Sequence, residues 1–306
     1  MEVGITFPQH ELAGDPEGVG EFCDTVESLG FRHLLAFDHV LGAEHRDRVP
    51  PLWGPYDEND PFHDPIALFS FLAGRTCRIK FVTGVLVLPQ RQTALVARQA
   101  ADLAILSGNR LRLGVGIGWN QVEYLALGQK FESRAARLEE QIELLRRLWT
   151  QKVVTFVGEF DTVDRAGCIP RPGSSIPIWL GGWADRALKR AARVGDGFIF
   201  AGDPDRVQGG WWRMKSFLAE EGRSLARFGA DAVLPTFTDP GEAADFIGQW
   251  AEAGGSHVTL STNRPGLASV QAHVEYLAEL AEALRRPGWL PADEAPPTEP
   301  SHQGEG

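Results

Sequence analysis

Residues 176–202 read IPIWLGGWADRALKRAARVGDGFIFAG, and this stretch combines a strand, a turn, a helix and a second strand. Residues 176–180 form a short apolar run behind a proline, which is typical of a buried parallel strand. Residues 183–194 carry apolar side chains at helical spacing, and residues 198–200 resume a strand. The stretch therefore predicts a right-handed βαβ unit whose helix begins at the paired glycines.

Gly181 and Gly182, the paired glycines, form a candidate anion site. Without Cβ atoms they allow unusual dihedral angles and let a ligand touch the backbone. Unpaired amides and the positive end of a helix dipole suit a phosphate, so the amides of residues 181–184, Trp183 included, are the expected contacts. A tight βα turn without a ligand would give the same spacing, and both interpretations stay open at this point.

The remaining chain repeats the same alternation of strand and helix. The expected strands are residues 3–7, 33–38, 79–85, 108–119, 176–180, 198–200, 232–237 and 257–260. This count predicts an α/β fold, a (β/α)₈ TIM barrel, with insertions after strand 2 and before strand 5. A doubly wound open sheet is the alternative, but its usual GxGxxG is replaced in the first βα turn by PQHELAGD. We expect a single domain over residues 1–286 and a disordered tail over residues 287–306.

Composition points to a small-molecule ligand. The chain has 306 residues, 43% of them hydrophobic, and a formal charge of -11, which disfavours nucleic acid and anionic membranes as general partners. Cys23, Cys77 and Cys168 form no CxxC pair, so neither a disulfide framework nor a metal site is predicted. The first residues resemble no targeting segment and no long apolar run occurs, so we expect a cytoplasmic protein, and a homo-oligomer stays open.

Several residues are expected at the barrel mouth, where the carboxyl ends of the strands meet. Residues 40–62 are too long for an ordinary βα loop and are interpreted as a lid, with Trp53 as a substrate contact. His39 ends strand 2 and can exchange protons near neutral pH. Gly116 and Gly118 lie where strand 4 reaches the mouth.

Five motifs, taken in order, resemble the luciferase-like flavin and deazaflavin oxidoreductases, and most closely their coenzyme F420-dependent branch. The motifs are DHV at 38–40, TGVLVLPQR at 83–91, LGVGIGW at 113–119 with Glu123, RLEEQIELLRRLW at 137–149, and the stretch quoted above. The resemblance covers roughly residues 3–262. It implies a cofactor ring across the barrel mouth and a cofactor phosphate at Gly181 and Gly182.

The resemblance also implies roles for other residues. A bulge after strand 3 would support the ring at Gly84 and Val85, where a cis peptide bond is expected. Gly116 and Gly118 would face the cofactor. Asp38 would contact the cofactor, and His39 would handle a proton.

Two further residues expected at the barrel mouth each have two possible interpretations. Glu123 is either a catalytic acid of the pocket or a charge that favours a helix N-terminus. Trp119 either stacks on substrate or packs on the following helix. The sugar-phosphate dehydrogenases of the family have Glu at the position of Trp119 and Trp at the position of Ala43, so their substrate is not carried over.

The sequence therefore predicts an oxidoreductase that uses F420 to transfer a hydride to or from a small organic substrate. An FMN-dependent monooxygenase is the first alternative. A barrel that binds a small ligand without turnover is the second.

Overall fold

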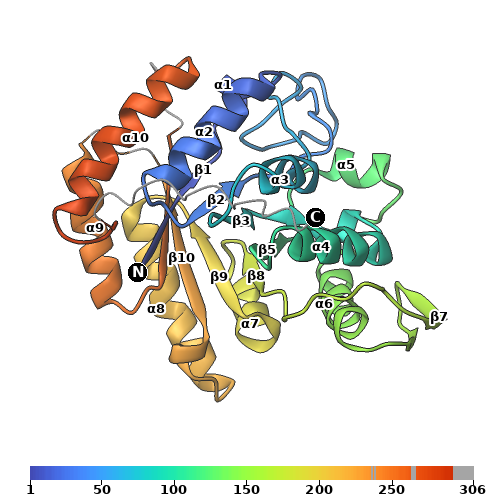
Figure 1. The fold of residues 1–306 in the computed structure, drawn as a ribbon. Coiled ribbons are helices and arrows are strands. Elements are labelled where there is room, and N and C mark those ends of the chain that lie inside the picture. The colour runs from blue at the N-terminus through green and yellow to red at the C-terminus, as the bar shows by residue number, and fades with distance from the viewer. Residues whose placement is uncertain (236, 238, 263–266, 292–306) are drawn as a thin grey trace, which may run out of the picture.

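The computed structural model describes residues 1–235, 237, 239–262 and 267–291, and within them eight parallel strands close into a barrel (Figure 1). The barrel strands are β1 (Glu2–Thr6), β2 (His33–Ala36), β3 (Lys80–Thr83), β5 (Leu111–Gly116), β8 (Ile178–Gly181), β9 (Gly197–Ala201), β10 (Gly229–Leu234) and β11 (His257–Leu260). Closure comes from the pairing of β3 with β5 and of β1 with β11, and the two-residue strand β4 (Leu86–Val87) extends the β5 edge.

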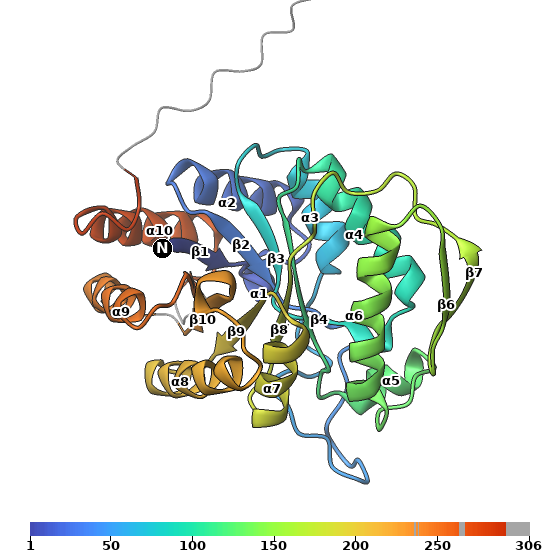
Figure 2. The same ribbon diagram turned by 90° about the horizontal axis from the view of Figure 1, so that it is seen from below.

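A long helix follows each barrel strand and covers the outside of the barrel (Figure 2). In chain order these helices are α2 (Pro16–Ser28), α3 (Pro65–Ala73), α4 (Thr93–Leu106), α6 (Arg134–Thr150), α7 (Asp185–Val194), α8 (Pro204–Glu220), α9 (Pro240–Glu252) and α10 (Val270–Arg285). The predicted (β/α)₈ fold is confirmed. Among the described helices, none is long and apolar enough to cross a bilayer.

Four of these helices begin at an Asp-Pro pair. The side chains of Asp15, Asp64, Asp203 and Asp239 each accept a hydrogen bond from an amide in the first turn, and a proline occupies the first helical position. The aspartate satisfies an amide that lacks an intrahelical partner, while the proline loses only an amide that would be unpaired anyway. Local sequence thus fixes where α2, α3, α8 and α9 start.

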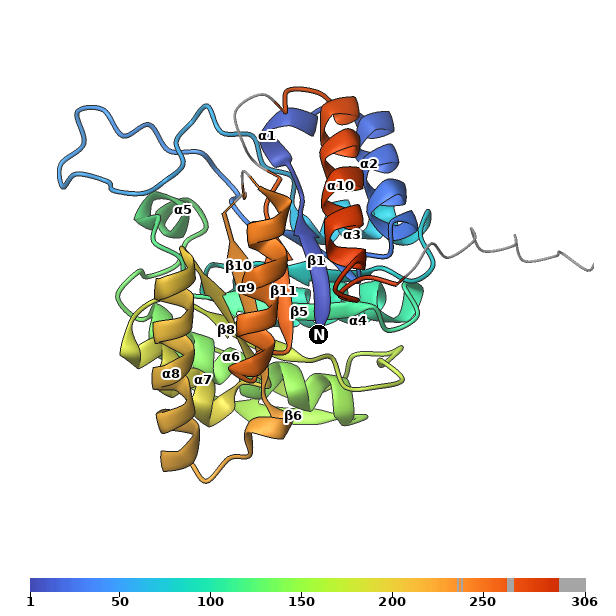
Figure 3. The ribbon, with the colours of Figure 1, turned by 90° about the vertical axis from the view of Figure 1, so that its left-hand side faces the viewer.

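Both predicted insertions are present. The segment between β2 and α3 is a long loop that reaches out beside α5 (Gln121–Ala126), as Figure 3 shows. Before β8, the antiparallel pair β6 (Val154–Val157) and β7 (Thr162–Ala166) forms a hairpin next to α6. The Glu140 carboxylate of α6 accepts hydrogen bonds from the amides of residues 159–161 at the hairpin turn, which ties the hairpin to the barrel.

Two predicted boundaries need correction. α7 begins at Asp185 with Ala184 as its cap, so Gly181 ends β8 and Gly182 lies in the connecting turn rather than at the start of the helix. At the other end, Leu290 is buried and residues 288–290 hydrogen-bond to the end of α10, so the packed chain extends beyond the predicted boundary at 286. The rest of the predicted tail, 292–306, lies outside the described residues.

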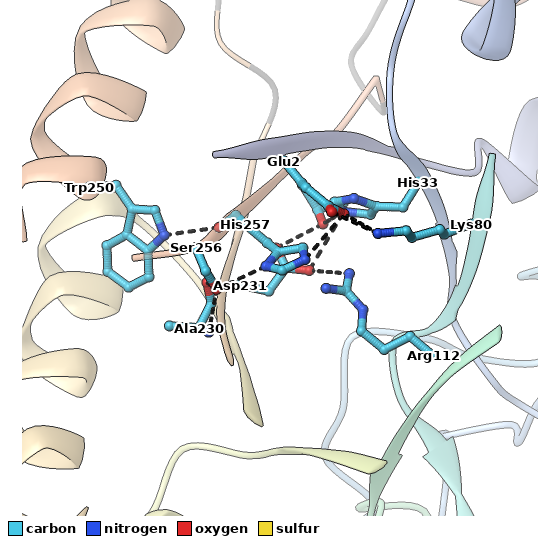
Figure 4. A network of polar contacts seen from close by, with 10 residues as sticks. Glu2, His33, Lys80, Arg112, Ala230, Asp231, Trp250, Ser256 and His257 are labelled. Atoms are coloured by element: carbon cyan, nitrogen blue, oxygen red, sulfur yellow. Dashed lines mark hydrogen bonds and ion pairs between the residues drawn. The ribbon is translucent and has the colours of Figure 1, made fainter. Parts of the chain in front are cut away.

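A polar network fills the amino-terminal end of the barrel (Figure 4). Arg112 donates to Asp231 at 2.7 Å, and Thr259 donates its hydroxyl proton to the other Asp231 oxygen at 3.0 Å. The Thr259 oxygen therefore accepts from Nε2 of His33 at 2.7 Å, which places a proton on Nε2. Nearer the rim, His257 and Lys80 lower the pKa of Glu2 to about 2. These groups are paired because unpaired charge at such depth is costly.

Acid should destabilise this fold through its buried histidines. Burial lowers the pKa of His33 well below its ordinary value, and burial also lowers the pKa of His257 and of His273. Below about pH 6.5 the unfolded chain binds protons at these rings more readily than the folded chain does, so the free energy of unfolding falls as the pH falls, most strongly through His33, by up to about 1.4 kcal/mol per pH unit for this ring. We expect the melting temperature, followed by circular dichroism, to fall between pH 7 and 5. His33→Gln should give a shallower fall, and equal slopes would contradict the assignment.

Candidate active site

His39 and Glu123 are in direct contact at the carboxyl-terminal mouth of the barrel. His39 Nδ1 lies 3.1 Å from Oε2 of Glu123, which projects from α5. The other carboxylate oxygen accepts from the amides of Val40 at 2.6 Å and Leu41 at 3.2 Å, and Glu123 is 1% exposed. The Glu123 carboxylate acts as an acceptor toward both amides, and it favours a proton on His39 Nδ1 in the same way. Nε2 is therefore the ring nitrogen that is left for proton exchange.

The long loop after β2 is held at both ends. At its start, the Asn120 side chain lies 3.5 Å from the Leu41 carbonyl, in addition to the Glu123 contacts. Near its end, Asp60 pairs with His10 at 2.8 Å and accepts from the Asp57 amide at 2.6 Å. Between these anchors, Gly54 lies against the Trp119 ring and Tyr56 lies beside His39.

Asp38 holds the segment after β3. Its buried carboxylate accepts from the Val87 amide at 2.8 Å and from Arg91 at 2.7 Å, and Arg91 also reaches Asp64 at 3.0 Å. Burial raises the pKa of Asp38, while Arg91 and the Val87 amide oppose that rise. Both oxygens are engaged by the protein, so the predicted cofactor contact of Asp38 stays a prediction and its observed partners are structural.

Aromatic rings surround His39. The ring centroids of Phe62, Tyr56 and Trp119 lie 4.8, 5.3 and 5.5 Å from the His39 ring centroid, at interplanar angles near 60°. Tyr56 and Phe62 come from the end of the long loop, and Trp119 follows β5. Trp53 is 82% exposed, and its predicted contact with substrate stays a prediction.

Val85 brings the predicted cofactor glycines together. The Gly84–Val85 peptide bond is cis, as the resemblance implied. A Cβ on Gly116 would lie 2.4 Å from one Val85 methyl group, and a Cβ on Gly181 would lie 2.7 Å from the other. Gly118 adopts φ +60° beside Val87, where L side chains are strained. Glycine is therefore required at positions 116, 118 and 181. We call the backbone of these residues around Val85 the glycine surface, and it lies at the same mouth as His39.

The turn after β8 offers exposed backbone amides. Gly182 has φ +147°, and among the described residues no hydrogen-bond acceptor is found for the amides of residues 182–184. The Trp183 indole donates to the Ala201 carbonyl at 3.2 Å, and the Arg206 guanidinium lies 4.7 Å above its ring. An anion at this turn would meet amides, the amino-terminal end of α7 and one nearby cation.

Some of these partners were not singled out from the sequence. Arg91 ends one of the quoted motifs, but its pairing with Asp38 and Asp64 requires the fold. Arg206 is a single arginine in the first turn of a helix, with no local signal that places it over Trp183. Across the described residues, no group of three or more His, Cys, Asp or Glu side chains is arranged to hold a metal ion.

Comparison with known sequences identifies relatives of the chain. A family model described as "Luciferase-like monooxygenase" matches residues 1–245. An uncharacterized protein of Mycobacterium tuberculosis is 40% identical over 204 residues, which are 65% of this chain and 70% of that protein. An F420-dependent glucose-6-phosphate dehydrogenase of Amycolatopsis mediterranei is 31% identical over 188 residues, 60% of this chain and 53% of that enzyme.

Solved structures share the fold. An F420-dependent secondary alcohol dehydrogenase in complex with an F420-acetone adduct superposes with a TM-score of 0.72 at 18% identity, over 93% of this chain and 99% of that one. Monooxygenase RslO1 of Streptomyces bottropensis gives 0.76 at 18% identity, over 93% and 98% of the two chains. At these identities the likeness supports the barrel architecture.

Proposed function

The chain belongs to the luciferase-like monooxygenase family, and on that premise we propose that it is an oxidoreductase that uses coenzyme F420 to exchange a hydride with a small organic substrate. The observation that supports this most is the cis Gly84–Val85 segment, with Val85 packed against Gly116 and Gly181, at the same mouth as the His39–Glu123 pair. Relatives named as F420-dependent dehydrogenases favour the deazaflavin.

The residues of the mouth fit such a cofactor. Gly116 and Gly181 let the Val85 side chain pack directly against the ends of β5 and β8, because a Cβ at either glycine would clash with a Val85 methyl group, and Val85 held there would support a flat ring. The amides of residues 182–184, with Arg206 nearby, would bind the cofactor phosphate. When bound, the deazaflavin supplies the carbon that gives or accepts the hydride.

We assign the proton to His39. Its Nε2 would hold or release the proton that balances the hydride on the substrate, because Nδ1 is committed to Glu123. Glu123 would orient the ring and keep the proton on Nδ1, a role that suits a carboxylate with almost no exposure. Residues 40–62 would act as a lid that excludes water from this reaction.

An FMN-dependent monooxygenase is the second candidate. The description of the family model and the likeness to RslO1 favour it. Titration of the purified protein with F420 and with FMN in parallel separates the two proposals. We expect saturable binding of F420 and weaker binding of FMN. Tighter FMN binding, with oxygen consumption by the reduced protein, would reject the F420 assignment.

Adding a side chain at Gly182 should weaken cofactor binding. At φ +147° an L residue is strained, and its Cβ would lie 2.9 Å from the Ala187 Cβ beside the exposed amides. For Gly182→Val we expect F420 affinity to fall at least about tenfold, or 1.4 kcal/mol, with an unchanged circular dichroism spectrum. Gly173→Val is the control, because a Cβ at Gly173 meets open space. Equal affinity of both variants would remove the glycine turn from the phosphate site.

A further inference from the structure

Three aromatic side chains without a formal charge line the mouth around His39. Tyr56, Phe62 and Trp119 enclose His39, and His45 meets the Trp119 ring edge-on at 6.1 Å and 85°. Burial raises the pKa of Tyr56, so its hydroxyl is a neutral phenol. Edge-to-face ring contacts are favourable beyond the area that they bury, and a ring of a bound molecule can take part in them equally well.

The charged groups beside these rings are already paired. Glu123 accepts from two amides and lies against His39, Asp60 pairs with His10, and Arg91 is taken by two aspartates. The cations that lie over aromatic rings in the described chain are stacked elsewhere, as Arg206 is over Trp183.

The long loop over residues 40–62 is itself acidic. Residues 40–62 carry five carboxylates and two arginines. Arg46 pairs with Glu44, and Arg48 donates to the Glu44 carbonyl. A phosphate group on the substrate would meet aromatic edges and carboxylates, and such a desolvated, unpaired anion is costly.

The loop backbone also lies directly against Trp119. A Cβ on Gly54 would fall 2.1 Å from the six-membered ring of this indole, so only glycine lets the chain cross there. The loop thereby covers a ring that sits beside His39, and its withdrawal would uncover aromatic surface rather than a charged one. Tyr56 and Phe62 belong to this loop, so all three rings surround His39 only while the loop is seated.

On the basis of the proposed function, we propose that the substrate of this site is an uncharged ring compound and not a phosphorylated sugar. The compound would be held against Trp119, Phe62 and Tyr56 beside His39. Trp119 would set this preference as the largest of the three rings. The relatives named for glucose 6-phosphate would then share the fold and differ in substrate class.

Direct binding tests the proposal without turnover. Saturation-transfer NMR and calorimetry on the full chain would compare 2-cyclohexen-1-one and 1-indanone, two neutral ring ketones, with D-glucose 6-phosphate. We expect the ketones to bind at least about tenfold more tightly than the sugar phosphate. Trp119→Ala should weaken ketone binding about three- to tenfold and Trp119→Phe less, in line with the energy of ring contacts. Trp212→Ala, which removes a 74% exposed indole from α8, should leave it unchanged.

The outcomes separate this proposal from the proposed function. Tighter binding of glucose 6-phosphate, binding of neither ketone, or equal ketone affinity in wild type and Trp119→Ala would each overturn the substrate class. Titration of the same samples with F420 tests the cofactor assignment independently of the substrate class. Ketone binding that depends on Trp119, without F420 binding, would reject the cofactor assignment and support the substrate class. F420 binding with a preference for the sugar phosphate would support the cofactor assignment and reject the substrate class.

Discussion

The His39→Asn variant should turn over substrate about 10² to 10⁴ times more slowly than the wild type while F420 affinity changes little. Asparagine keeps a similar size and one hydrogen bond to Glu123, but it cannot exchange a proton near neutral pH. Steady-state rates between pH 5 and 9, with cofactor affinity from titration, measure the two quantities. His63→Asn is the matched control, because His63 is exposed and packs near Phe7.

The opposite pattern would reassign the proton. Near wild-type turnover of His39→Asn across the whole pH range would remove histidine from the mechanism and leave Glu123 or bound water as the carrier. Asp38→Ala serves as a second comparison, because Asp38 holds Val87 and Arg91 beside the glycine surface. If Asp38 positions the cofactor, this variant should weaken F420 binding before it slows turnover.

Asp231→Ala should lower the free energy of unfolding by about 3 to 5 kcal/mol. The substitution leaves the Arg112 guanidinium buried without its carboxylate partner and also removes the acceptor of the Thr259 hydroxyl. Chemical denaturation followed by circular dichroism measures the effect.

The control is an ion pair in solvent. Glu282→Ala breaks a contact with Arg286 in which both side chains are at least 70% exposed, so it should cost less than about 1 kcal/mol. A loss for Asp231→Ala that is no larger than this would show that water or a neighbouring group compensates Arg112.

Local signals explain how much of the fold could be predicted. The β8–α7–β9 unit is present, as the apolar pattern of residues 176–202 predicted, and Asp64 caps α3 through its side chain. Periodicity and caps depend on residues within a few positions of each other, so one sequence contains them. The cis bond at Gly84–Val85 was predicted from the family motif alone.

Long-range pairing explains what the sequence could not give. His33, Arg112, Asp231 and Thr259 meet only because four strands adopt a particular register, and each looks like an ordinary strand residue by itself. At the mouth, His39 and Glu123 were both singled out, but their contact across 84 positions follows from where α5 lies. The substrate contact predicted for Trp53 depends on the direction of its side chain, which is exposed in the structure, and a loop sequence does not encode that direction.

The two anchors of the long loop bear on how this protein can evolve. Glu123 and Asn120 fasten its beginning to α5, and the His10–Asp60 pair fastens its end to the short helix α1 (Gln9–Leu12). Lengthening a flexible segment between fixed points costs only about 0.6 kcal/mol per doubling of its length. The intervening residues that do not pack on Trp119 or His39 can therefore be exchanged, extended or shortened while the closed sheet and the His39–Glu123 pair stay as they are, so selection for new substrates can act on them at little risk to folding.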